Sequence, residues 1–153
     1  MQRPSGGIAN PAFLDEELGK TLAANGLTAY LGPPGGYVLQ FSNGLVAYLS
    51  GDTGITAEQD SVIRRFFKAN LTVMNIGGTF TTGPKEAAWV VDELVQSKAV
   101  IVSHANEEAT KNGVVQPGTK TETFMKAIKA KAYVPLSGRV MEFDGEANCV
   151  SGC

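Results

Sequence analysis

Two spacings of apolar residues alternate along most of the chain. Short runs of consecutive apolar and β-branched residues are typical of buried strands, whereas apolar residues that recur every three or four positions are typical of helices with one buried face. From Leu45 onward the two spacings follow each other as strand, helix, strand, helix, strand, helix, strand. This order predicts an α/β domain whose strands place groups at their C-terminal ends. The predicted strands are Tyr37–Phe41, Leu45–Ser50, Leu71–Ile76, Ala99–Ser103, Ala132–Leu136 and Val140–Phe143.

Turn and capping residues set the expected boundaries of these elements. Ser42-Asn43-Gly44 joins the first two strands, and Asn-Gly between apolar runs is a strong hairpin signal. Thr56 and Gln59 fit a capping box, with Thr56 as the cap. Gly83-Pro84 opens a second helix, and Thr119 with Glu122 caps a third after a polar loop from residue 105 to 118.

The chain is expected to form one domain with an α/β core over residues 36–145. Residues 1–35 are irregular, with one helix over Pro11–Asn25 that has Asn10 as its N-cap. Its apolar stripe consists of Phe13, Leu14, Leu18 and Leu22. Residues 146–153 are interpreted as a tail.

Composition narrows the class of protein. Of 153 residues, 43% are hydrophobic and 18% charged, which predicts a globular chain with a core. The net charge of −2 gives no electrostatic footprint for nucleic acid or an anionic membrane surface. No apolar run approaches the ~20 residues that span a bilayer, and the first residues lack the apolar region of a signal peptide. A cytoplasmic location is the default expectation.

The two cysteines, Cys149 and Cys153, lie within the last five residues. Their spacing does not match a zinc site without a second ligand pair. We expect reduced thiols in a frayed tail, with a local disulfide or an intermolecular contact as the alternatives.

Three predicted strands end in residues that could carry chemistry. Asp52 follows the second strand in a Gly51–Gly54 turn, and His104, the only histidine, follows the strand that ends at Ser103. Because C-terminal strand ends meet at one rim of an α/β sheet, we predict that both side chains lie there, on neighbouring strands, close enough to share a metal or water. Aspartate and histidine are metal ligands and serve acid–base chemistry. A turn aspartate that bonds its own loop, and a structural histidine, are the plainer alternatives.

A glycine-bounded loop follows the third predicted strand. It has the glycine spacing of a phosphate-binding P-loop, but Pro84 and Lys85 stand where that motif has Lys and Ser or Thr, so an NTPase is rejected. The helix start could still bind an anion through free N–H groups. The candidate residues are Gly78, Thr79, Thr82 and Gly83.

Together, these segments resemble the metallo-β-lactamase superfamily, and its lactonase-like branch in particular. The similarity covers roughly residues 35–145 and is carried by three stretches: Tyr48-Leu49-Ser50-Gly51-Asp52-Thr53-Gly54, Asn75–Ala88 and Val102-Ser103-His104. The resemblance implies that Asp52 bridges two metal ions, zinc or manganese, that His104 binds the second, and that the metals activate a water for hydrolysis. After the histidine, relatives often continue Tyr-Gly-Thr, where this chain has Ala105-Asn106-Glu107.

The same resemblance implies a partial site. The family carries a His-x-His-x-Asp-His signature in its first half and a further histidine, and this chain has neither. It resembles the C-terminal half of an αββα sandwich, a mixed sheet with helices on one face. The other face would then be exposed and apolar, so we expect a homodimer or a complementary N-terminal half as partner.

Three functions follow as hypotheses. The first is a metal-dependent hydrolase with an incomplete metal site, acting on a small molecule if active. The second is a catalytically inert binding or interaction module on the same scaffold. The third is an unrelated α/β protein in which Asp52 and His104 are incidental.

Overall fold

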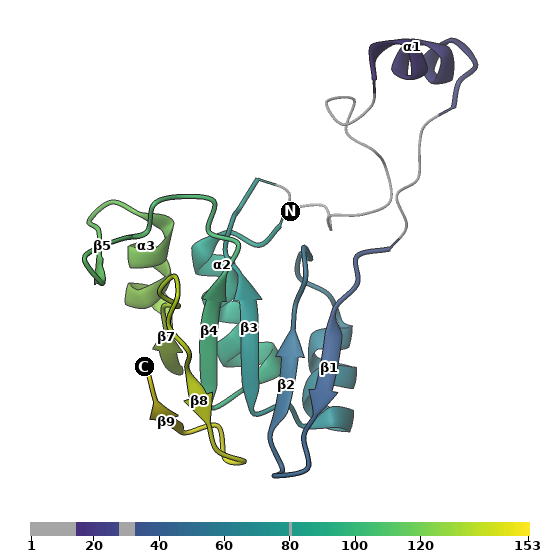
Figure 1. Ribbon diagram of the computed structural model, residues 1–153. Coiled ribbons are helices and arrows are strands. Elements are labelled where there is room, and N and C mark those ends of the chain that lie inside the picture. The colour runs from purple at the N-terminus through teal and green to yellow at the C-terminus, as the bar shows by residue number, and fades with distance from the viewer. Residues whose placement is uncertain (1–14, 28–32, 80) are drawn as a thin grey trace.

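The computed structural model describes residues 15–27, 33–79 and 81–153. Within these residues a five-stranded mixed sheet has the order β1-β2-β3-β4-β7 (Figure 1). β1 pairs antiparallel with β2, and the other neighbours pair in parallel, as the alternation of spacings predicts. The strands of this sheet are β1 (Tyr37–Gln40), β2 (Val46–Leu49), β3 (Leu71–Asn75), β4 (Ala99–Ser103) and β7 (Lys131–Tyr133).

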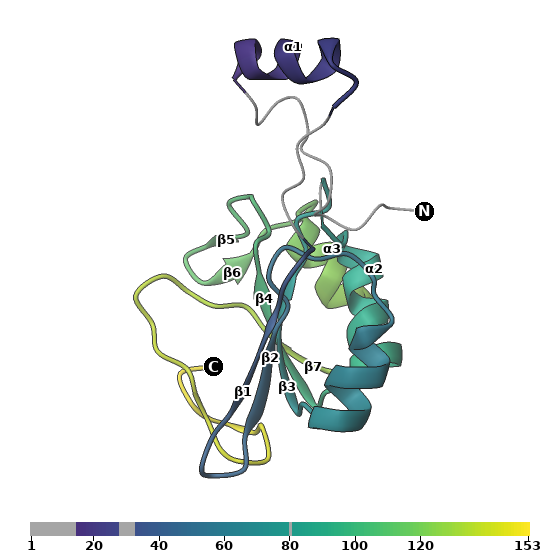
Figure 2. The same cartoon turned by 90° about the vertical axis from the view of Figure 1, so that its right-hand side faces the viewer.

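The helices that connect the parallel strands lie on one face of the sheet (Figure 2). This arrangement confirms the predicted fold class of a mixed sheet with helices on one face. Side chains from both layers form the main core, in which Met74, Val100 and Phe124 are almost wholly buried. The connecting helices are η2 (Gln59–Phe67, a π-helix), α2 (Pro84–Trp89), which runs on into the π-helix η3 (Val90–Val95), and α3 (Lys120–Ala127).

Of the three helix starts predicted after residue 50, two are confirmed. Gly83 is the N-cap of α2 with Pro84 in its first turn, and the Thr119 hydroxyl accepts from the Glu122 N–H at 3.0 Å at the start of α3. Thr56 does not cap η2, because that helix begins at Gln59. The return contact of the predicted box is present, since the Thr56 N–H donates to Gln59 Oε1 at 3.0 Å.

A C-terminal hairpin covers part of the second face of the sheet (Figure 2). It consists of β8 (Glu142–Phe143) and β9 (Cys149–Ser151), so β8 pairs with β9 instead of joining the main sheet. β9 lies within the segment interpreted as a tail from the sequence. The Phe143 ring packs edge-on against Tyr133 with 5.3 Å between ring centroids. The small side chains under the hairpin include Ala47, Ala99 and Ala147.

The rest of the second face is less covered. One cross-sheet row on this face runs through Tyr37, Leu49, Val73 and Ile101, which are register partners across β1, β2, β3 and β4. The Tyr37 side of this row is open, with Tyr37 72% and Leu39 44% exposed. We call this surface, made by Tyr37, Leu39, Leu49, Val73 and Ile101, the open apolar face.

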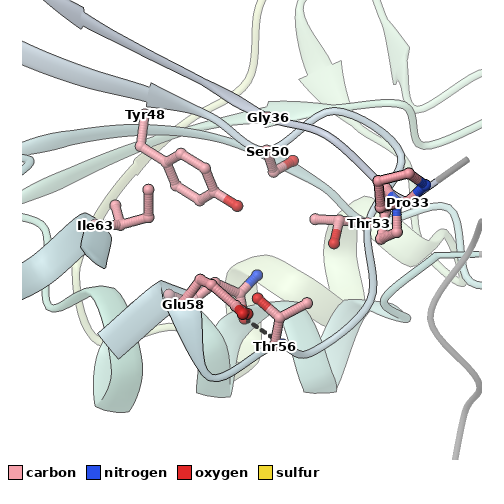
Figure 3. Close-up of a pocket in the computed structure, with 10 residues that line it drawn as sticks. Pro33, Gly36, Tyr48, Ser50, Thr53, Thr56, Glu58 and Ile63 are labelled. Carbon is pink, nitrogen blue, oxygen red and sulfur yellow. Dashed lines mark hydrogen bonds between the residues drawn. The ribbon is translucent and has the colours of Figure 1, made fainter. Parts of the chain in front are cut away.

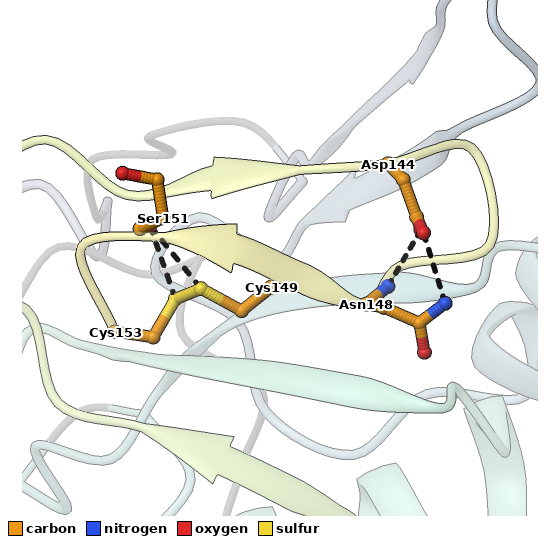
Figure 4. The surroundings of a disulfide bond; sticks show 5 residues. All are labelled: Asp144, Asn148, Cys149, Ser151 and Cys153. Carbon is orange, nitrogen blue, oxygen red and sulfur yellow. Dashed lines mark hydrogen bonds between the residues drawn. A yellow bond between two sulfur atoms is a disulfide. The ribbon is translucent and has the colours of Figure 1, made fainter.

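The expectation of reduced, frayed thiols is wrong for this structure. Cys149 and Cys153 are joined by a disulfide at the end of the hairpin, with 6.3 Å between their Cα atoms (Figure 4). Both sulfur atoms lie near the Ser151 carbonyl oxygen. The chain turns back after β9 and brings Cys153 to Cys149, so this pairing is local and needs no partner chain (Figure 4).

The remaining differences concern the N-terminal helix and the loop before α3. The helix α1 (Glu16–Ala24) has Asp15, not Asn10, as its N-cap, and residues 10–14 of the prediction lie outside the described residues. None of the residues of α1, all of them described, is buried. The loop before α3 contains a small hairpin, β5 (Thr110–Lys111) with β6 (Val114–Val115). Among the residues that the structure describes, no helix has the length and apolarity needed to cross a membrane.

Candidate functional site

Asp52 and His104 meet at the rim formed by the C-terminal ends of the parallel strands. His104 Nδ1 lies 2.6 Å from Asp52 Oδ1, so the predicted proximity of the two side chains is confirmed. The prediction that they come from neighbouring strands is wrong, because β3 lies between β2 and β4. The loop that follows β3 therefore leaves the sheet between the loops that carry Asp52 and His104.

Both candidate ligands sit on tightly constrained backbone. Gly51 has φ +58°, and a Cβ there would collide with the Gly35 carbonyl oxygen, so this turn requires glycine. His104 has φ +49°, in a left-handed conformation that residues other than glycine adopt infrequently. Such conformations persist where surrounding contacts impose them, and they are frequent at functional sites. Here the conformation turns the chain sharply at the end of β4, where the imidazole meets Asp52.

A buried polar network lies beneath the Asp52 turn. The Asn75 side-chain amide donates to Ser50 Oγ, to the Gly51 carbonyl and to the Thr53 carbonyl. Its own oxygen accepts from the Thr82 hydroxyl at 2.7 Å. Asn75, Ser50 and Thr82 are each almost fully buried, so the network connects β3 to the turn out of contact with solvent. The sequence predicted Thr82 as an anion-binding residue and did not single out Asn75 or Ser50; a polar side chain at the end of a mostly apolar strand was the available signal.

Lys120 ties the β3 exit to the His104 turn. Its ammonium group donates to the carbonyl oxygens of Gly77 and Ala105, each at 2.9 Å. The Glu107 carboxylate accepts from the backbone N–H groups of Lys120 and Thr121 at the start of α3. Burial acts to raise the pKa of Glu107, but these hydrogen bonds and the Lys120 charge outweigh it and lower that pKa below its usual 4.5. The Lys120 and Glu107 side chains thus connect the start of α3 to the loops at the rim.

The candidate anion-binding residues lie in the loop between β3 and α2, and they differ in accessibility. Thr79 is exposed, but the Thr82 hydroxyl points inward and donates to Asn75. At the start of α2, a Cβ on Gly83 would lie 2.6 Å from Glu86 Oε2, so a carboxylate already occupies that end of the helix. Phe80 lies outside the described residues. Anion binding by Gly78, Thr79, Thr82 and Gly83 stays a prediction.

Asp52 and His104 are of the residue types that bind metals, but two side chains are fewer than a catalytic metal site normally has. A carboxylate oxygen and an imidazole nitrogen are both ligands for zinc and manganese, and an ion bound by both would lie about 2 Å from each. The side chains are accessible, with 67% of Asp52 and 35% of His104 exposed. Within the described ranges, however, no group of three or more His, Cys, Asp or Glu side chains is placed to hold a metal ion. Catalytic zinc normally has three protein ligands and a water, whereas the described residues bring two side chains of the right kind together at this rim.

A cavity of about 480 Å³ adjoins the turn on the helix side of the sheet (Figure 3). The hydroxyl of Tyr48 points into it. Burial raises the pKa of this phenol, and a side-chain hydrogen bond with Gln59 acts in the opposite direction. Neither Asp52 nor His104 lines the cavity, so it is distinct from the rim. Its lining consists of Pro33, Pro34, Gly36, Tyr48, Ser50, Thr53, Thr56, Glu58, Gln59 and Ile63.

Comparison with known proteins identifies relatives of this chain. No family model matches it. A UPF0173 metal-dependent hydrolase from Cupriavidus necator is 32% identical over 120 residues, which cover 76% of this chain and 39% of that protein. The chain is related to part of the UPF0173 metal-dependent hydrolases. The kinship with metal-dependent hydrolases that its strand-end motifs imply is thereby confirmed, and the lactonase-like branch stays a prediction.

Two solved structures are also similar. Igni18, a metallo hydrolase from Ignicoccus hospitalis, superposes with a TM-score of 0.51 at 25% identity over 68% of this chain and 43% of its own. A putative zinc-dependent hydrolase of the metallo-β-lactamase superfamily from Thermotoga maritima gives a TM-score of 0.47 at 21% identity, over 68% of this chain and 70% of its own.

The relatives are longer than the matched region. The chain spans 34% and 39% of the length of two of the curated relatives it matches most strongly. Whatever else those proteins use for activity, more than half of their length has no counterpart in this alignment.

Proposed function

We propose that this chain is part of a metal-dependent hydrolase of the metallo-β-lactamase superfamily and supplies Asp52 and His104 to its metal site. The observation that carries the proposal is the 2.6 Å contact between Asp52 Oδ1 and His104 Nδ1 at the rim. The kinship with metal-dependent hydrolases supports a metal as the shared ligand of this pair.

The proposed roles follow from the chemistry of the two groups. Asp52 would bridge two ions, and His104 would bind the second through Nδ1. When bound, zinc or manganese supplies an activated water for attack on a small-molecule substrate. The chain's own contribution is to hold a carboxylate and an imidazole on short, constrained turns, so that little reorganisation accompanies metal binding.

Two ligands predict weak binding by this chain alone. Further ligands would come from a second copy of the chain or from a complementary segment of the kind that the longer relatives contain. An inert interaction module is the alternative, because an incomplete donor set also suits a scaffold that has no metal chemistry.

Manganese titration followed by NMR tests this proposal directly. Mn²⁺ broadens the signals of nuclei close to it even when binding is weak. We expect selective broadening at Gly51–Thr53 and at His104, with loss of the effect in Asp52→Asn and in His104→Ala. Glu108→Gln is the control, since it removes an exposed carboxylate near the same rim. Broadening centred elsewhere, or unchanged in the two site variants, would refute the metal role and favour the inert module.

A tight stoichiometric zinc site in calorimetry, abolished by His104→Ala, would also be informative. It would contradict the expected weakness and mean that a second copy completes the site.

The proposed assembly is a homodimer through the open apolar face. The exposed residues Tyr37 and Leu39 lie in alternate positions along the edge strand. From Tyr37 the apolar row continues across the sheet to Val73 and Ile101, which are half-buried. A second copy offers the same surface, so a two-fold axis makes it self-complementary. A cytoplasmic location stays part of the proposal.

A further inference from the structure

We propose that Asn75 is a positioning residue that holds the Asp52 turn in the geometry needed for metal binding. The inference rests on the proposed function of Asp52. It concerns a side chain that is not one of the two proposed metal ligands and is only 1% exposed.

The side-chain nitrogen of Asn75 donates to the residues on both sides of Asp52. Nδ2 lies 2.7 Å from the Gly51 carbonyl oxygen and 3.2 Å from the Thr53 carbonyl oxygen, the two residues that flank Asp52. It also lies 3.0 Å from Ser50 Oγ. One amide group therefore fixes the backbone on both sides of the candidate ligand.

The acceptor side fixes which way the amide faces. The Thr82 hydroxyl lies 2.7 Å from Asn75 Oδ1 and 2.9 Å from the Asn75 carbonyl oxygen. Because the Gly51 and Thr53 carbonyl oxygens can only accept hydrogen bonds, the NH₂ group must face the turn, and Oδ1 then meets the Thr82 hydroxyl. Ser50 Oγ in turn accepts from the Asn75 backbone N–H at 3.0 Å and contacts the Gly51 carbonyl oxygen at 3.0 Å. Every polar atom of this network is therefore satisfied.

The cost of such a network indicates a purpose beyond burial. A buried amide is unfavourable unless it is fully hydrogen-bonded. An apolar residue at the end of β3 would avoid burying that amide, but it would leave the Gly51 and Thr53 carbonyl oxygens without this donor. Here the hydrogen bonds end on the turn of Asp52, and the turn is additionally joined to the β3 exit, because the Thr82 N–H donates to the Thr53 carbonyl. Asn75 and Thr82 thus anchor the Asp52 turn, which follows β2, to the end of β3 and its exit loop.

Two threonines provide a matched test. Thr82 and Thr72 are both fully buried, and the hydroxyl of each makes a short side-chain hydrogen bond, to Asn75 Oδ1 and to Ser97 Oγ at 2.9 Å respectively. Thr82→Val and Thr72→Val therefore remove equivalent groups, but only the first acts on the turn. Asn75→Asp replaces the amide donors directly at constant shape.

The measurements are amide hydrogen exchange at Thr53, whose N–H donates to the Gly51 carbonyl, and the Mn²⁺ concentration for half-maximal broadening at the turn. We expect Thr82→Val and Asn75→Asp to speed Thr53 exchange at least tenfold relative to Ser50 and to raise the Mn²⁺ concentration several-fold. Thr72→Val should lower overall stability to a similar degree and leave both readouts unchanged, and Thr82→Ser should restore them.

The two readouts separate this inference from the proposed function. If the wild-type chain shows no Mn²⁺ effect, the metal role fails while the exchange data still decide the positioning role. Thr53 exchange that is unchanged in Thr82→Val, or that rises equally in Thr72→Val, would overturn the inference. If Asn75→Asp does not fold, Thr53 exchange in Thr82→Val still tests the positioning role.

Discussion

Replacing Gly77 with alanine would test how closely the two loops at the rim are packed. A Cβ at position 77 would lie 2.6 Å from the His104 carbonyl oxygen, 3.3 Å from Asn106 Nδ2 and 3.4 Å from Thr81 Oγ1. The closest of these atoms belongs to the backbone, so it cannot move aside as a flexible side chain would. Since Gly77 does not have a positive φ, the penalty is steric.

The expected cost is that of an extra methyl group in a well-packed site. Overpacking of this kind costs about 1–3 kcal/mol. For a chain of this size each kcal/mol lowers the melting temperature by roughly 2–4 °C, so Gly77→Ala should melt roughly 2–12 °C below the wild type. The displaced atom belongs to His104, and the imidazole should therefore move away from Asp52.

Thermal unfolding and NMR of the single histidine measure the two effects. Gly35→Ala is the control, because a Cβ there meets nothing within 4 Å and its φ is not positive. That variant should match the wild type or gain up to about 1 kcal/mol from a less flexible unfolded chain. A Gly77→Ala protein with wild-type melting temperature and an unchanged His104 spectrum would refute the close packing of the rim loops.

Two further predictions concern pH and assembly. Because the pKa of Glu107 is lowered in the folded protein, its carboxylate contributes stability that is complete above pH 4.5 and is lost as pH falls through the lower folded-state pKa. Urea unfolding should therefore show Glu107→Gln destabilised by about 0.5–2 kcal/mol at pH 7, as for the loss of a helix cap, with the difference shrinking below pH 4.5. A difference that is independent of pH, or equal to that of Glu108→Gln, would contradict this assignment. For assembly, the melting temperature of the wild type should rise with protein concentration, and Leu39→Lys on the open apolar face should abolish the rise. Light scattering that finds a folded 16.1 kDa monomer with a concentration-independent melting temperature would refute the dimer.

Features with a local cause were predictable from the sequence. Gly83-Pro84 and Thr119 act within one turn of their helices, and both were placed correctly. Asp52 and His104 were brought together by a rule about strand ends, which needs only the order of elements.

Features that depend on long-range packing were not predictable in this way. Nothing local in Glu142–Ser151 specifies that its hairpin packs on the second face of the sheet. That β3 lies between the strands that lead to Asp52 and His104 could be known only from the strand order. Asn75 gained its partners from the neighbours that this order gives it. The small hairpin at β5 and β6 is different, because Asn112-Gly113 carried a recognisable turn signal that was interpreted as part of a loop.

The strand order has a consequence for synthesis of the protein on the ribosome. The main sheet is assembled in the order of the chain, so each parallel strand that emerges can pair with the edge of the strand before it. The β1–β2 hairpin is the local starting point, since its pairing closes a short loop, whereas every later pairing must close a longer one. The β8–β9 hairpin emerges after all five strands of the main sheet, and until it does, the alanine and leucine side chains it covers remain in water. An apolar surface of the main sheet is therefore exposed until the β8–β9 hairpin has been synthesised, and docking of that hairpin shields it.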